Sequence, residues 1–307
     1  MKNKSINEVS AIAVKKRRTG AQKREMISGY LFILPFMLLL IIFSILPIFM
    51  TFLQSFEEGG TVGPRTFVGL ENYIKILSDR KYYDYLLNNF LYIIMSLPIG
   101  QVIAFSLALY LKKATKLSPI FETIYFMPLL ISMVAASVMM SYLFSVNGPI
   151  NYLLEMIGLE APNWLNQPWS ARVVIVILEI WKGCTFYIYI YVAALRGIPN
   201  DYYEVGLIEG ASSFQMLRKV TLPLMRNSIL LCVIMSTIWQ FQLFDSVYTT
   251  TFGGPLNSTK SVVYAIYELT FKNNLTGLGA ALSMLFLIII LLITALQLRL
   301  NKGDIEY

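Results

Sequence analysis

Six long apolar segments, separated by polar connections, dominate this 307-residue sequence. A helix needs about 20 mainly apolar residues to cross a bilayer. Backbone polar groups in lipid must be paired internally, and these runs are too long and too continuously apolar for barrel strands. The sequence therefore predicts an all-α membrane protein with six transmembrane helices. The segments are 29–53, 89–111, 120–145, 172–195, 227–248 and 278–299.

Composition supports a membrane location and argues against several classes of function. Charged residues make up 14% of the chain, against about 25% in a soluble domain. Histidine is absent, which removes the commonest metal ligand and general base. Cys184 and Cys232 lie inside apolar runs, without zinc-site spacing or a disulfide framework. We therefore expect neither a catalytic nor a metal site. A membrane transferase or a scaffold without transport remains an alternative to a transporter.

The distribution of Lys and Arg predicts that both termini are cytoplasmic. Seventeen of these residues lie in the N-terminal tail, the 112–119 loop, the 196–226 segment and the C-terminal tail, against six in the opposite connections. Short cytoplasmic segments carry such an excess. The net charge of +7 is thus a topology signal and does not indicate nucleic-acid binding. The predicted parts are a tail over 1–28, a transmembrane region over 29–299 and a tail over 300–307.

The N-terminal apolar segment is a retained helix and not a signal peptide. A signal peptide has an apolar core of roughly 7–15 residues. Here no charged residue occurs between Glu25 and Glu57, which is long enough to span a bilayer. We therefore expect the first helix to stay in the membrane of the mature chain.

The cytoplasmic segment 197–225 carries signals for two short helices joined by a bend. Pro199 suits the first turn of a helix, and Gly210 can end that helix. Ser212 followed by Gln215 fits a capping box that starts a second helix. Pro223 then stops it. The segment exposes more apolar area than a connector needs, which indicates a partner surface.

This segment resembles the coupling loop, or EAA loop, of ATP-binding-cassette (ABC) importer permeases. Glu204, Gly210 and the ending Val220-x-Leu222-Pro223 occupy the positions of that motif, with Val205 and Gly206 in place of two alanines. The resemblance implies that the loop docks into an ATPase. Gly210 would then need a special backbone geometry or a close approach. The implied ATPase-coupling residues are Tyr203, Glu204, Val205, Gly206, Leu207, Glu209, Gly210, Ala211, Phe214, Leu222 and Pro223.

Further segments resemble the sugar-importing branch of these permeases, of the maltose and multiple-sugar type. They are residues 29–35, 67–73, 198–204 and 252–255. The resemblance implies that the chain helps to move a sugar, most readily an oligosaccharide, into the cytoplasm by alternating access. A polar solute that is not a sugar, such as a phosphorylated polyol, is the alternative.

The same resemblance implies the partners. They are a second homologous permease, two cytoplasmic ATPase subunits and an external solute-binding protein, assembled on a bacterial cytoplasmic membrane. The chain itself lacks the Gly-x-x-x-x-Gly-Lys-Ser/Thr phosphate loop. We therefore expect this chain to bind no cofactor and to be no enzyme, with ATP and Mg²⁺ used by the partner ATPases.

Polar residues inside the apolar segments are the candidates for a substrate path. Glu179 and Lys182 are three residues apart and share one helical face. Exposing either charge to lipid costs at least about 2.5–3.5 kcal/mol. They therefore form a structural ion pair or line the path. The amides, carboxylate and aromatic rings of the fourth and fifth segments suit a sugar, although interhelical hydrogen bonding is the alternative. The predicted path residues are Glu179, Lys182, Tyr187, Trp239, Gln240, Gln242 and Asp245.

Overall fold

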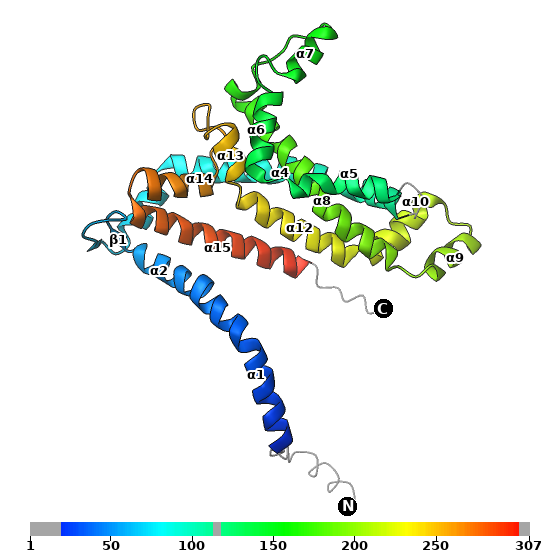
Figure 1. The fold of residues 1–307 in the computed structure, drawn as a ribbon, viewed down its shortest axis with the longest axis horizontal. Helices are drawn as coiled ribbons and strands as arrows, with labels where there is room; N and C mark the ends of the chain where they lie inside the picture. Colours follow the sequence, from blue (N-terminus) through cyan, green and yellow to red (C-terminus); the bar gives the residue numbers. More distant parts are fainter. Residues whose placement is uncertain (1–19, 113–117, 301–307) are drawn as a thin grey trace, which may run out of the picture. The chain divides into compact units, whose positions relative to one another are not determined.

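The computed structural model describes residues 20–112 and 118–300, which are largely helical (Figure 1). The chain forms two units, residues 1–51 and 52–307. Most of the predicted tails, together with residues 113–117 of the first cytoplasmic loop, lie outside the described residues. The N-terminal helices are α1 (Gly20–Leu40), the π-helical η1 (Ile41–Ile45) and α2 (Leu46–Gln54).

The second unit is built around long helices joined by short ones. Its first elements are β1 (Glu57–Glu58), β2 (Thr66–Phe67), α3 (Glu71–Ser78), α4 (Arg80–Leu111), α5 (Ser118–Leu130), α6 (Met133–Leu143), α7 (Pro149–Met156), η2 (Trp164–Asn166) and α8 (Pro168–Arg196). The others are α9 (Asp201–Ile208), α10 (Ser213–Met216), η3 (Leu217–Thr221), α11 (Leu222–Leu224), α12 (Arg226–Phe241), α13 (Asp245–Thr250), α14 (Val262–Tyr267), η4 (Glu268–Lys272) and α15 (Thr276–Leu300). Strands β1 and β2 pair antiparallel.

Four helices of the described chain are long and apolar enough to cross a membrane: Arg24–Gln54, α4, α8 and α15. The other two candidate spans are bent helix pairs, one within the third predicted span and one that begins before the fifth. Residues 123–130 and 133–143 meet at 103°, and residues 213–224 and 226–241 meet at 69°. Counting each bent pair as one span gives the six that the sequence predicts, and that exact count stays a prediction.

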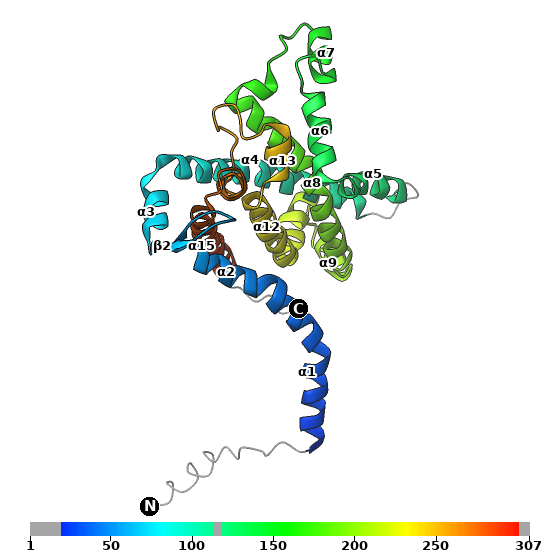
Figure 2. The ribbon, with the colours of Figure 1, turned by 60° about the vertical axis from the view of Figure 1, so that its left-hand side comes forward.

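The third predicted span is broken at Ile131 and Ser132, between the end of α5 and the start of α6. Pro128 lacks a backbone donor, and Ser132 starts a new helix because its Oγ accepts from the Ala135 amide at 3.2 Å. Helix α6 therefore leaves the long helices steeply and leads to α7 (Figures 1 and 2). The fifth span also differs, since α12 ends at Phe241 and α13 begins at Asp245, inside the predicted 227–248 helix.

Several connections lie at two opposite ends of the second unit, with β1 and α14 at one end and α9 and α10 at the other, while α7 projects away from the long helices (Figure 1). At the first end, the Thr276 amide donates to the Gly59 carbonyl at 3.1 Å, and Asn88 Nδ2 donates to the Lys260 carbonyl at 3.0 Å. At the second end, Arg196 Nη2 donates to the Leu111 carbonyl at 3.3 Å. These are the connections that the charge pattern assigns to opposite sides of the membrane.

Helices α4 and α8 form the centre of the unit. Ala104 and Ala108 of α4 are completely buried against a cluster that includes Tyr191 and Leu195 of α8. Small side chains at such a contact allow the helix axes to approach closely. Both cysteines are buried and free, and they pack in this same cluster.

Candidate functional site

The segment 197–225 folds as the predicted helix, bend and helix. Ser212 Oγ accepts from the Gln215 amide at 3.3 Å, and Gln215 Oε1 accepts from the Ser212 amide at 2.7 Å, which completes the capping box. Pro199 lies before α9 and not in its first turn, because Asn200 is the N-cap. Pro223 does not stop the helix either. It lies in the first turn of α11, where proline is tolerated, and the bend comes at Met225.

We call residues 197–225 the coupling segment, after their predicted role. Two glycines shape this segment for different reasons. Gly210 has a φ of +74°, a region that other L-residues avoid, and no atom of another described residue lies within 4 Å of where a Cβ would stand. Of the two expected reasons for a glycine at position 210, a special backbone geometry and a close approach, the structure shows the first. The close approach occurs at Gly206, where a Cβ would stand 2.8 Å from Met216 Cε. The sequence did not reveal that contact, because the bend alone brings Met216 back over α9.

The coupling segment presents apolar side chains away from the unit. Leu207 is 68% exposed and Phe214 69% exposed. The structure adds Ile208, which is 86% exposed and was not predicted as a site residue. Other predicted coupling residues with exposed side chains are Glu204, Val205, Glu209, Leu222 and Pro223. Gly206 is buried, and Ala211 is half-buried.

Tyr203 differs from its neighbours because it faces the helices. Lys112 Nζ lies 3.7 Å from the centroid of the Tyr203 ring, and the Tyr203 hydroxyl lies 3.3 Å from Thr221 Oγ1. Lys112 is the C-cap of α4. The ring therefore connects α9 both to the end of α4 and to the second arm of the coupling segment, a role distinct from a docking contact.

Lys182 binds the broken helix. Its Nζ donates to the Pro128 carbonyl at 3.1 Å and also to the Ile131 carbonyl. These carbonyls lie where α5 ends, so the ammonium supplies donors that a continuous helix would have provided. Within the described residues, no ion pair joins Lys182 to Glu179. Lys182 thus has a structural partner, but a different one from that expected.

Four of the seven predicted path residues line one small polar cavity between α4, α8 and α12. They are Glu179, Tyr187, Trp239 and Gln240. The cavity has a volume of about 30 Å³, enough for one water molecule. Gln240 Oε1 is buried without a hydrogen-bond partner, so it is available to a molecule that enters. The Trp239 ring packs 5.8 Å from that of Tyr187.

Ser96 and Ser236, which are not among the seven predicted path residues, complete the polar lining of this cavity. Ser236 lies one helical turn before Gln240, and that spacing is a usable signal. In contrast, Gln242 and Asp245 do not line the cavity. Gln242 is the exposed C-cap of α12, and Asp245 is exposed at the start of α13. The end of α12 at Phe241 separates them from the cavity.

Sequence comparison places relatives along nearly the whole chain. The trehalose/maltose transport system permease protein MalF of Thermococcus litoralis is 31% identical over 281 residues, covering 91% of this chain and 95% of the relative. The lactose transport system permease protein LacF of Rhizobium radiobacter is 32% identical and covers 83% of this chain and 87% of the relative. The arabinooligosaccharides transport system permease protein AraP of Halalkalibacterium halodurans is 32% identical, covering 90% and 89%.

Structure comparison shows the same fold in solved transporters. A chain of a bacterial alginate ABC transporter, solved in complex with an alginate pentasaccharide-bound periplasmic protein, superposes with a TM-score of 0.78. That alignment covers 91% of this chain and 95% of the other, at 21% identity. Residues 73–303 match the family described as the inner membrane component of binding-protein-dependent transport systems. This chain is a membrane protein that belongs to that family, the permease subunits of ABC transporters.

Proposed function

We propose that the chain is the permease subunit of an ATP-driven importer that moves a sugar, most readily an oligosaccharide, into the cytoplasm by alternating access. The observation that carries this proposal is the coupling segment. It is a helix, bend and helix at one end of the unit, and its Leu207, Ile208 and Phe214 are largely exposed among the described residues. Apolar side chains in this arrangement fit the groove of a partner protein.

The charge pattern supports a cytoplasmic position for this segment and for both termini. An ATPase that binds there would pull on the segment when it closes on ATP. Two connections support transmission of that movement. The Tyr203 ring contacts Lys112 at the end of α4, and α10, η3 and α11 lead through the bend at Met225 into α12.

The polar cavity is the candidate for the substrate path. Glu179 and Gln240 offer acceptors for hydroxyl groups, and Trp239 and Tyr187 offer aromatic faces for a sugar ring. Since α4, α8 and α12 all line it, a change in their packing would widen it. Its present size suits a closed state of the path.

The proposal includes partners that this chain requires. They are a second homologous permease, two ATPases that bind ATP and Mg²⁺, and an external solute-binding protein. Saccharides occur in the names of several relatives, namely trehalose, maltose, lactose and arabinooligosaccharides. This agreement favours a sugar over a phosphorylated polyol.

Copurification and uptake test the proposal. The chain would be co-expressed with the second permease and ATPases of its organism, and the complex reconstituted in proteoliposomes. We expect ATPase copurification and uptake of maltotriose, lactose or arabinotriose that requires both ATP and the binding protein. Uptake of glycerol 3-phosphate and of none of these sugars would show that the solute is a phosphorylated polyol. A chain that never retains an ATPase would refute the importer.

A further inference from the structure

A second and larger polar cavity opens at the end of the unit opposite the coupling segment. Its volume is about 390 Å³. It lies between the first turns of α4, the first turns of α8 and the loop 251–261. Its polar and apolar lining includes Lys81, Asp84, Asn88, Arg172, Leu256 and Ser258. None of the path residues predicted from the sequence lines it.

Arg172 is the cation of this cavity that forms no ion pair within the described residues. Its Nε donates to the Ser258 carbonyl at 2.8 Å, and its Nη2 donates to Asn88 Oδ1 at 3.1 Å. Both acceptors are neutral. Across the described residues, no carboxylate forms an ion pair with Arg172, although Asp84 lines the same cavity. Lys81, in contrast, is paired with Asp79 at 2.6 Å.

The guanidinium retains donors for a ligand. It has five N–H groups in a planar fork, and two of them are used within the chain. A half-buried charge without a counterion is unfavourable unless something pairs with it. A carboxylate is the group that matches the remaining N–H groups, because it can accept two parallel hydrogen bonds.

Leu256 stands at the rim of the cavity in an unusual conformation. Its side chain is 94% exposed, and its φ is +52°, followed by +60° at Asn257. Positive φ values are rare for residues other than glycine and persist where the surroundings impose them. An apolar side chain held in solvent in this way serves a protein contact better than a contact with a hydrated solute.

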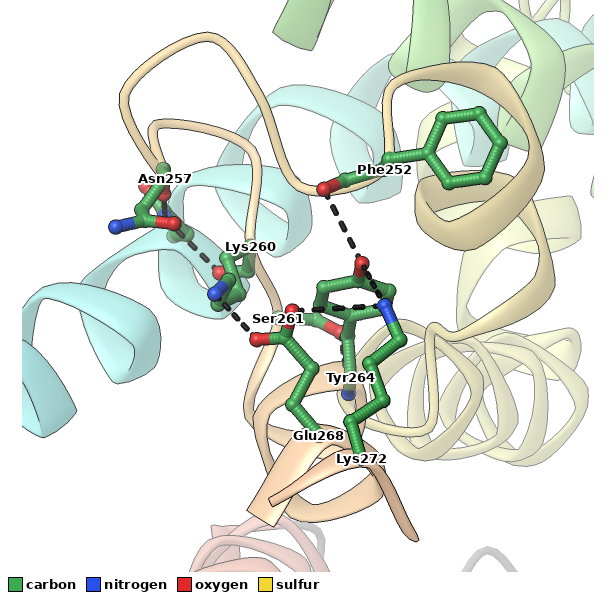
Figure 3. A network of polar contacts seen from close by, with 8 residues as sticks. Phe252, Asn257, Lys260, Ser261, Tyr264, Glu268 and Lys272 are labelled. Carbon is green, nitrogen blue, oxygen red and sulfur yellow. Dashed lines mark hydrogen bonds and ion pairs between the residues drawn. The ribbon is translucent and has the colours of Figure 1, made fainter.

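The loop that carries Leu256 is held by a network of polar contacts (Figure 3). Lys260 forms an ion pair with Glu268, and Lys272 Nζ lies 3.7 Å from Glu268 Oε1. Lys272 also donates to the Tyr264 hydroxyl at 3.3 Å, which in turn donates to the Phe252 carbonyl at 3.2 Å. The hydrogen bond with Tyr264 raises the pKa of Lys272 above its usual value, which favours the charged form of that side chain. A loop that is already ordered loses little entropy on binding.

We propose that this cavity and Leu256 form a docking site for the solute-binding protein, in which Arg172 receives an aspartate or glutamate side chain of that protein. The inference rests on the proposed function, which supplies the partner and the outward orientation of this end. Charge complementarity selects the acidic group, and Leu256 supplies the apolar contact beside it.

The test measures how the binding protein stimulates ATP hydrolysis by the full complex in phosphatidylcholine nanodiscs. Arg172→Gln should raise the half-saturating concentration of the binding protein by about tenfold to a hundredfold, the range for losing a charged hydrogen bond. The maximal rate should not change. Arg80→Gln, which removes an exposed cation of the same helix α4, is the matched control and should leave the half-saturating concentration within about twofold.

Leu256→Asn separates docking from folding. Asparagine accepts positive φ, so thermal stability should be kept or raised. The half-saturating concentration should still rise by about tenfold, as for the loss of one buried apolar side chain. Arg172→Glu should also raise the half-saturating concentration, and replacing one acidic residue of the binding protein with arginine should lower it again.

Three results would overturn the docking site. One is unchanged half-saturation in both Arg172→Gln and Leu256→Asn with normal stability. Another is a lower maximal rate of uptake at saturating binding protein, which would place Arg172 in the path. The third is an effect that needs phosphatidylglycerol in the nanodisc, which would identify a lipid phosphate as the ligand. In each of these cases the ATPases would still copurify with the permease. Failure of the docking site is therefore distinguishable from failure of the proposed function.

Discussion

Gly210 gives the sharpest test of how the coupling segment works. Its φ of +74° lies in the left-handed region, and none of the other described residues occupies the space that a Cβ would fill. Gly210→Ala therefore adds no clash within the chain. Its cost is the left-handed backbone alone, about 1–2 kcal/mol. That free energy corresponds to roughly a 5- to 30-fold loss of affinity when the bend must be present for docking.

The assay is the dissociation constant of the ATPase for the permease pair in detergent, measured for three variants. Gly210→Asn is the control, because asparagine tolerates the left-handed region and should recover most of the affinity. Gly210→Asp should behave as asparagine does unless its charge meets the partner. Equal losses for alanine and asparagine would refute the backbone explanation and indicate a close approach by the ATPase.

Three other predictions concern single contacts. Lys182→Met should lower the free energy of unfolding of the solubilised chain by about 1.5–3 kcal/mol, because the Pro128 and Ile131 carbonyls lose their donor. Lys182→Arg should keep most of that stability. Adding Glu179→Gln to Lys182→Met should restore none of the lost stability in a double-mutant cycle. Tyr203→Leu should weaken ATPase-coupled uptake, because it removes the ring that contacts Lys112. In a chain that already carries Lys112→Gln, Tyr203→Leu should have no further effect on uptake. A double-mutant cycle of the two substitutions should give a coupling energy of about 0.5–2 kcal/mol. Ile208→Asp should reduce ATPase copurification without changing membrane insertion, whereas Ile74→Asp, at a residue 61% exposed on α3, should leave copurification intact.

Local signals in the sequence predicted local structure well. The capping box at Ser212 and Gln215 and the positive φ at Gly210 follow from residue types and spacing, and both are present. The long apolar runs predicted α4, α8 and α15, because in lipid a helix is the regular conformation that pairs the backbone polar groups within a single segment. Pro98 inside α4 shows that a proline is not by itself a break.

Contacts between distant residues could not be predicted. Hydropathy does not distinguish a continuous span from the pair broken at Ile131 and Ser132, since α5 and α6 are equally apolar. The partners of Lys182 lie more than 50 residues away, so helical spacing could only suggest Glu179. The lining of the cavity at Gln240 was predicted in part, because polar residues inside apolar helices indicate such a site. Gln242 and Asp245 were predicted to line it but do not, because α12 ends at Phe241.

The bond between Lys182 and the end of α5 also has a consequence for biosynthesis. The ribosome makes Pro128 and Ile131 well before it makes Lys182, so the carbonyls at the break enter the insertion machinery without their donor. Unpaired carbonyls are unfavourable in lipid. The third segment should therefore stay beside the translocon or in contact with water until the fourth arrives, and the two should enter the bilayer together. For this part of the chain, the order of synthesis and the order of folding differ.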